Sequence, residues 1–127
     1  MKNRQLKFRV WNGKQMYYQT GSIMYDDMIA FEFDPFKNEP DYGMEVMQFT
    51  GLYDKNGKEI YEGDIIPIYD IEMKLHNAVV KYCIEDGAYI VAYEDPVLLD
   101  DMYYMLADLF DLEVVGNIYE NEYLLNQ

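Results

Sequence analysis

The sequence predicts a mainly β protein built from coiled antiparallel sheets. Its clearest signals are three hairpin turns, each between two apolar runs, at Asn12-Gly13, Asn56-Gly57 and Asp86-Gly87. Gly after Asn or Asp supplies the positive φ angles that a tight antiparallel turn needs. The 14 tyrosines suit half-buried pleated surfaces. Because an antiparallel sheet has open edges to hide, we expect the sheet to be closed or strongly coiled.

The N-terminal third begins with a predicted hairpin over residues 5–19. Apolar and polar residues alternate from Leu6 to Trp11, as they do along a strand, and a second short run follows the Asn-Gly turn. One or two short strands are expected in residues 21–33. Residues 34–43, which hold two prolines and several polar groups, are predicted to be a variable loop. No other boundary is indicated, so residues 1–127 are expected to form a single domain.

The middle of the chain reads as a series of strands and tight turns. In order, the apolar runs predict strands at residues 46–53, 59–61, 65–69, 78–84 and 88–93. Pro67 cannot donate a ladder hydrogen bond, so its strand is expected to lie at an edge or to end early. Residues 70–77 are expected to be a polar connection.

One short helix is predicted near residues 96–110. Asp95 can cap its start, with Pro96 as the first helical residue. Spacings of three and four then place five apolar residues on one face: Leu98, Met102, Met105, Leu106 and Leu109. Residues 112–119 are expected to return to strand, with an interruption at Gly116-Asn117, so that a helix and a final strand fill residues 96–120.

The sequence contains no recognisable metal or phosphate site. One His and one Cys cannot form a zinc centre. Three acidic pairs, Asp26-Asp27, Glu85-Asp86 and Asp100-Asp101, lack the spacing of a calcium-binding loop. The glycines stand singly and suit turns or bulges better than phosphate-binding loops: Gly51, Gly57, Gly63, Gly87 and Gly116. We therefore expect neither a metal nor a cofactor.

Nucleophilic catalysis has little support either. Ser22 or Cys83 can in principle pair with His76, the only histidine. His76, however, precedes an apolar run and is expected to be exposed or at a strand start. Cys83 lies in a strand-like run and is expected to be a structural thiol. We expect no catalytic residues, and hence no enzyme.

Charge is distributed unevenly along the chain, which has a net charge of -14. Residues 2–14 hold five basic residues and no acid, whereas residues 82–127 hold eleven acids and no Lys or Arg. Such an acidic stretch is not expected to bind a phosphate backbone, because that affinity comes from Lys and Arg. It is either a solvated surface or an acidic face for a basic partner.

Location and assembly follow from simpler features. The N-terminus lacks the apolar core of a signal peptide, and no apolar run is long enough to span a bilayer, so a cytoplasmic location away from membranes is expected. The lone cysteine agrees with that location. Tyr and Met are enriched in interfaces, so a homo-oligomer or a protein partner is expected.

Three segments in fixed order resemble the YopX family of bacteriophage and prophage proteins. They are residues 6–17; residues 47–65, which hold Thr50-Gly51-Leu52-Tyr53-Asp54 and Tyr61-Glu62-Gly63-Asp64; and residues 112–121, which hold Val115-Gly116-Asn117. The resemblance extends from about residue 5 to residue 125 and is poor between residues 19 and 45. It departs at Pro67, where the strand usually continues unbroken.

The resemblance implies an SH3-like barrel motif, which the strands between about residues 46 and 93 can form. It also implies a phage or prophage origin, and hence a bacterial host cell. It implies no agreed activity and no catalytic residues. We interpret the shared motifs as mainly architectural.

Three functions without catalysis remain open from the sequence. The first is a protein-interaction or self-assembling module that uses the Tyr- and Met-rich surface. The second is an acidic decoy that mimics nucleic acid and blocks a host DNA-binding protein; the acidic stretch from residue 82 onward suggests it, with residues 94–122 as the region to mutate. The third, which the net charge opposes, is nucleic-acid binding by the barrel through Lys2, Arg4, Lys7, Arg9, Trp11 and Lys14.

Overall fold

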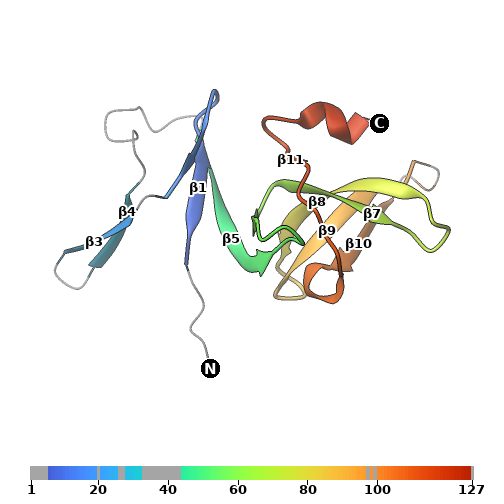
Figure 1. The fold of residues 1–127 in the computed structure, drawn as a ribbon, viewed down its shortest axis with the longest axis horizontal. Helices are drawn as coiled ribbons and strands as arrows, with labels where there is room; N and C mark the ends of the chain where they lie inside the picture. Colours follow the sequence, from blue (N-terminus) through green and yellow to red (C-terminus); the bar gives the residue numbers. More distant parts are fainter. Residues whose placement is uncertain are drawn as a thin grey trace. The chain divides into compact units, whose positions relative to one another are not determined.

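The computed structural model describes residues 6–19, 21–25, 28–32, 44–96, 98 and 100–126 (Figure 1). For residues 21–25 and 28–32 it describes the backbone alone. The chain divides into two compact units, Met1–Phe49 and Thr50–Gln127. The single-domain organisation expected from the sequence stays a prediction.

The described part of the first unit contains two hairpins and half of a longer strand. Strand β1 (Phe8–Trp11) pairs antiparallel with β2 (Met16–Tyr18) and, on its other side, with the first half of β5 (Glu45–Tyr53). Strands β3 (Gly21–Tyr25) and β4 (Met28–Glu32) form the second hairpin. The hairpin over residues 5–19 and the short strands in residues 21–33 are thus confirmed. The predicted loop at 34–43 lies outside the described residues.

The second unit is dominated by a curled five-stranded antiparallel sheet with the strand order β10-β9-β8-β7-β11 (Figure 1). The second half of β5 neighbours a short strand in the same unit, β6 (Glu59–Tyr61). This architecture confirms a mainly β protein with coiled antiparallel sheets. The bounds in the five-stranded sheet are β7 Asp64–Tyr69, β8 Leu75–Cys83, β9 Ala88–Glu94, β10 Asp101–Met105 and β11 Gly116–Asn117.

The core of the second unit is built from alternate residues of β7, β8 and β9, together with Ile60 on β6, Leu106 in η2 and Val114. Burying one such side chain contributes about 1.5–3 kcal/mol, so this cluster supplies much of the driving force for folding. Its buried members are Ile60, Ile66, Ile68, Ala78, Val80, Val91, Tyr93, Leu106 and Val114.

The prediction of a helix near residues 96–110 is wrong. Asp95 Oδ1 does accept the N–H of Leu98, as a helix cap would, but Asp101–Met105 form strand β10. Only a single 3₁₀ turn, η2 (Leu106–Asp108), follows it. Tyr103-Tyr104 favours strand, and pairing with β9 satisfies an edge that would otherwise be open, so tertiary pairing overrides the helical spacing.

The prediction of a strand over residues 112–119, broken at Gly116-Asn117, is also wrong, because within it only Gly116 and Asn117 are strand. The residues before β11 bond different partners in turn: Val114 N donates to the Asp54 carboxylate and Val115 N to the carbonyl of Ile65. These residues therefore do not form a regular ladder of hydrogen bonds with one neighbouring strand.

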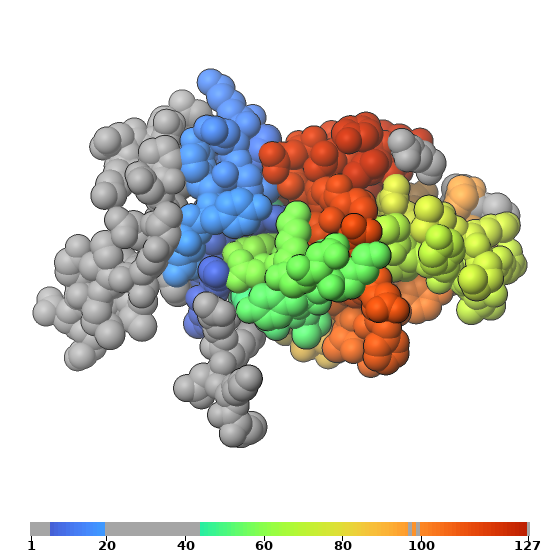
Figure 2. Space-filling view, in the orientation of Figure 1, coloured from blue at the N-terminus to red at the C-terminus, as the bar shows by residue number. Residues whose placement is uncertain are grey.

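Side-chain bonds hold the β11 region in a fixed shape. Asn117 Oδ1 accepts from the N–H groups of Tyr119 and Glu120, and Asn121 Oδ1 accepts from Asn117 N. A Cβ on Gly116 would lie 2.6 Å from Asn121 Oδ1, so a side chain at Gly116 would break this arrangement. The last short helix, η3 (Glu122–Asn126), lies at the surface at the red end of the chain (Figure 2).

Strand β7 is longer than its proline suggests, because it continues through Pro67 to Tyr69. Strand β11 pairs only with Asp64 and Ile65, so Pro67 lies beyond the end of that pairing. Pro67 therefore lies where β7 is an edge, as predicted, but β7 does not end early at this proline. The predicted polar connection over residues 70–77 is shorter than expected, because β8 begins at Leu75.

Among the described residues, no helix is long and apolar enough to cross a bilayer.

Candidate functional site

A five-residue turn, Asp70–Lys74, joins β7 to β8 at one end of the sheet (Figure 1). Asp70 Oδ1 accepts the backbone N–H groups of Glu72 at 2.8 Å and Lys74 at 2.9 Å. In the backbone, Asp70 N donates to the Lys74 carbonyl and Met73 N donates to the Asp70 carbonyl, both at 2.9 Å. Four hydrogen bonds around one aspartate thus fix the path of this turn.

The other carboxylate oxygen of Asp70 ties the turn to the sheet. It lies 2.8 Å from Nε2 of His76 on β8. The hydrogen bond from His76 is the strongest influence holding the pKa of Asp70 below its ordinary value, and the N–H groups of Lys74 and Glu72 act in the same direction. An ionised carboxylate can only accept, so His76 Nε2 carries the proton. His76 in turn stacks on Tyr93, with ring centroids 3.9 Å apart.

Four large apolar side chains on and beside this turn are exposed; we call them the apolar tip. They alternate with charged residues and are Tyr69, Ile71, Met73 and Leu75. Ile71 is 94% exposed and Met73 is 74% exposed. Groups of exposed apolar side chains that lie close together in the chain are candidate interaction sites.

Met73 also has a backbone conformation that is unfavourable for its type. Its φ is 63°, in the left-handed region, which costs a residue with a Cβ about 1–2 kcal/mol. Strain of this kind at an exposed position is more common at functional sites than elsewhere.

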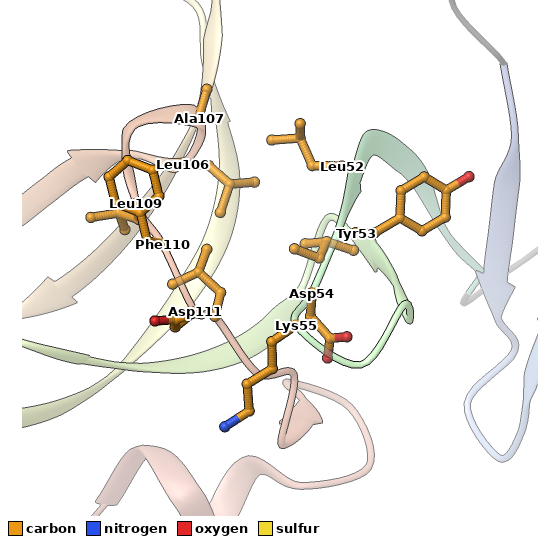
Figure 3. A pocket seen from close by; sticks show the side chains of 11 residues that line it. Leu52, Tyr53, Asp54, Lys55, Leu106, Ala107, Leu109, Phe110 and Asp111 are labelled. Atoms are coloured by element: carbon orange, nitrogen blue, oxygen red, sulfur yellow. The ribbon is translucent and has the colours of Figure 1, made fainter.

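A small apolar pocket lies elsewhere in the same unit (Figure 3). It has a volume of about 240 Å³, and we call it the apolar pocket. Figure 3 shows leucine side chains converging on it from β5 and from the segment after β10, with Lys55 and Asp111 on one side. Phe110, in its wall, is 87% exposed. Its apolar lining is Leu52, Ile60, Leu106, Ala107, Leu109, Phe110 and Leu112, and Tyr53, Asp54, Lys55 and Asp111 complete it.

A larger groove of about 630 Å³ lies beside His76 on the sheet. Its charged lining is balanced, with two lysines, Lys74 and Lys81, and two acids, Glu94 and Asp101. The balance favours neither an anionic nor a cationic ligand.

The sequence profile described as YopX protein matches residues 7–126, nearly the whole chain. The chain belongs to the YopX family. A crystal structure of protein EF1440 from Enterococcus faecalis is also similar, with a TM-score of 0.60 and 24% sequence identity over 97% of this chain and 99% of that chain. That identity establishes a likeness of fold. No curated protein matches the chain.

The segments that carry the YopX resemblance bond backbone groups, as an architectural role predicts. Asp64 Oδ2 accepts the N–H of Tyr61, while the backbone of Gly63 donates to Val80 and accepts from Ile118. The apolar tip lies outside those segments. Sequence reasoning missed it by treating residues 70–77 as polar, although apolar and charged residues alternate there.

Cys83 lacks the lowered pKa of an activated thiol in this YopX protein. The backbone N–H of Asp86 lowers the pKa of Cys83, but burial and the Glu85 and Asp86 carboxylates outweigh it and raise that pKa. Cys83 and His76 are seven residues apart on one strand, roughly 23 Å, so they do not form a pair. Ser22 belongs to β3 in the first unit.

Tyr93, beside His76, is also unsuited to act as a base. Burial and then the neighbouring Tyr104 raise the pKa of Tyr93 to about 12. Its phenol is therefore neutral at physiological pH, and the His76–Tyr93 stack positions the turn.

The acidic pairs and the basic N-terminal residues are only partly described. Asp26, Asp27, Lys2 and Arg4 lie outside the described residues. Where the structure describes the chain, no three His, Cys, Asp or Glu side chains gather as metal ligands. Asp100 Oδ1 accepts from the N–H of Asp101.

Arg9, one of the proposed nucleic-acid contacts, is buried. It is 2% exposed, and its Nε donates to Met47 Sδ at 3.4 Å. The strand face of Lys7, Arg9 and Trp11 therefore lacks its central cation as a phosphate contact.

Proposed function

We propose that this YopX-family protein is a non-enzymatic protein-interaction module that docks through the apolar tip. The observation that carries the proposal is the rigid, strained turn that exposes Ile71 and Met73. Burial of two such side chains gains roughly 3–6 kcal/mol. Because hydrogen bonds to Asp70 already fix the turn, little ordering cost opposes that gain.

The proposed partner surface is a small apolar pocket on a protein. Glu72 and Lys74 flank the tip with one charge of each sign and pair with each other at 3.3 Å. Exposed pairs of this kind contribute little energy, so apolar contact is the main attraction and the charges select orientation. We further propose that the protein acts in the cytoplasm of a bacterium carrying a phage or prophage, as the sequence leads us to expect.

The test is site-specific photo-crosslinking. A benzophenone amino acid replaces Ile71 in one variant and Asp86, an exposed residue of the β8–β9 turn, in the matched control. In lysate of a bacterial host, position 71 is expected to crosslink to a protein, whereas position 86 is not. Equal crosslinking from both positions, or none from position 71, would overturn the proposal.

The same experiment separates the two alternatives. An acidic decoy would crosslink to a DNA-binding protein from residues 94–122 and not from position 71. Nucleic-acid binding would leave crosslinks to DNA or RNA.

A further inference from the structure

We propose that the protein assembles head to tail, the apolar tip of one copy inserting into the apolar pocket of the next. The inference rests on the proposed function and names the partner as a second copy of this chain. Both surfaces belong to the unit Thr50–Gln127, and no tip residue lines the apolar pocket. The tip of a copy therefore does not fill the apolar pocket of that same copy.

The size and chemistry of the pocket match a side-chain tip. A volume of about 240 Å³ lies below the roughly 300–1,000 Å³ of pockets for drug-sized ligands, so one or two side chains suit it better. Four of its eleven lining residues are leucines, and Phe110 in its wall is largely exposed. Ile71, almost fully exposed, has the matching apolar surface.

Each surface carries charges of both signs, so opposite charges can face each other across the contact. The tip carries Glu72 and Lys74, and the pocket is lined by Lys55, Asp111 and the buried Asp54. Lys55 also pairs with Glu113 at 3.5 Å across exposed side chains, and an incoming Glu72 can share it. Insertion can thus pair Glu72 with Lys55 and Lys74 with Asp111.

This contact joins two different surfaces, so it does not close on itself as a symmetric dimer does. Repetition gives rings or open chains. A single turn buries less than the roughly 1,200 Å² of stable specific interfaces, and a charge of -14 on every copy opposes association. We therefore expect weak affinity, with a Kd on the order of 0.1–1 mM.

Mixing complementary variants tests the proposal. Ile71→Asp places a charge on the tip, and Phe110→Asp places a charge in the wall of the pocket, so each variant disables one of the two surfaces. Both residues are exposed, so each variant is expected to fold. Ile84→Asp, at another highly exposed isoleucine outside tip and pocket, is the matched control. Circular dichroism and a urea transition verify folding of all three. Sedimentation velocity at protein concentrations on the order of 0.1–1 mM then measures mass.

The expected result is specific to a head-to-tail contact. The native chain and Ile84→Asp grow beyond two copies, while Ile71→Asp and Phe110→Asp each remain monomeric alone. Their equimolar mixture keeps one intact tip and one intact pocket per pair, so it forms dimers and stops there. A native chain that stays monomeric, or an Ile71→Asp variant that associates as the native chain does, would overturn the inference.

Failure here is distinguishable from failure of the proposed function. A monomeric native chain whose position 71 still crosslinks to a different protein rejects self-assembly and leaves the interaction module standing. No crosslink from position 71 to any protein, itself included, rejects both.

Discussion

The β5–β6 turn begins at Asp54 and the β7–β8 turn begins at Asp70, and the two share one pattern of hydrogen bonds. In each turn Oδ1 accepts N–H groups two and four residues on, at 2.9 Å from Asn56 and Lys58 in the first. The backbone bonds between the first and fifth residues also correspond. The fourth residue has a positive φ in both, 81° at Gly57 and 63° at Met73.

The two turns differ in what surrounds this shared frame. Asp54 is 7% exposed, and its Oδ2 accepts the N–H of Val114, which connects distant parts of the unit. Asp70 bonds His76 on the adjoining strand. The first turn has Gly in the left-handed position, and the second has an exposed Met. The shared hydrogen-bond pattern thus forms without an exposed apolar residue in the first turn. The exposed apolar residues of the second turn are therefore not needed for folding of the turn.

The largest expected effect comes from removing the buried carboxylate. Asp54→Ala leaves the N–H groups of Asn56, Lys58 and Val114 without their acceptor and should lower the free energy of unfolding by about 2–4 kcal/mol. Urea unfolding measures the loss. Asp70→Ala is the matched control and should lose less, because water can reach its exposed turn. An equal loss of unfolding free energy in the two variants would contradict the difference proposed between the two turns.

Exchanging the left-handed residues gives the next effect. Gly57→Met introduces backbone strain without a clash and should destabilise by about 1–2 kcal/mol. Met73→Gly relieves backbone strain, which stabilises the fold, but it also adds conformational entropy to the unfolded chain, which offsets part of that gain. The free energy of unfolding should therefore stay the same or rise by up to about 1 kcal/mol. Urea midpoints of both variants decide this. Strong destabilisation by Met73→Gly would show that Met73 supports the fold.

Acid should weaken the fold through both aspartates. Burial raises the pKa of Asp54, but the N–H groups of Val114, Lys58 and Asn56 outweigh it and hold the pKa below its ordinary 3.8. A carboxyl with a lower pKa in the folded state stabilises fully above its unfolded pKa and loses that contribution as pH falls through its folded pKa. Stability measured downward from pH 5 should therefore decline more steeply below pH 3.8 in the native chain than in Asp54→Asn. Identical slopes would contradict this assignment.

The smallest effect is expected from His76→Phe. Phenylalanine keeps the stack on Tyr93 but removes the hydrogen bond to Asp70. The pKa of Asp70 should then rise toward its ordinary value, as an NMR titration of the carboxyl would record. Tyr104→Phe is a control that leaves the Asp70 bond intact. An unmoved Asp70 pKa would show that His76 does not tie the turn to the sheet.

Most strands up to residue 93 could be predicted from the sequence, because turns such as Asn56-Gly57 and Asp86-Gly87 are local signals. The C-terminal part could not, because the helical spacing from Leu98 to Leu109 competes with an open edge of β9 that exists only in the folded sheet. Similarly, the backbone N–H of Val114 donates to the carboxylate of Asp54, sixty residues away, and therefore does not join a strand ladder.

The candidate site was less visible than the fold. His76 was expected at a strand start and is there, but its pairing with Asp70 and stacking on Tyr93 depend on three-dimensional placement. The alternation of Ile71, Met73 and Leu75 with charged residues was visible in the sequence, yet their exposure depends on the turn lying beyond the sheet.

The most direct test of this contrast between the turns is the sedimentation of Met73→Gly beside the native chain, at concentrations where the native chain associates. The account predicts a variant at least as stable as the native chain in urea, with weaker self-association. A variant that is less stable and associates unchanged would contradict it, because Met73 would then serve the fold and not the contact.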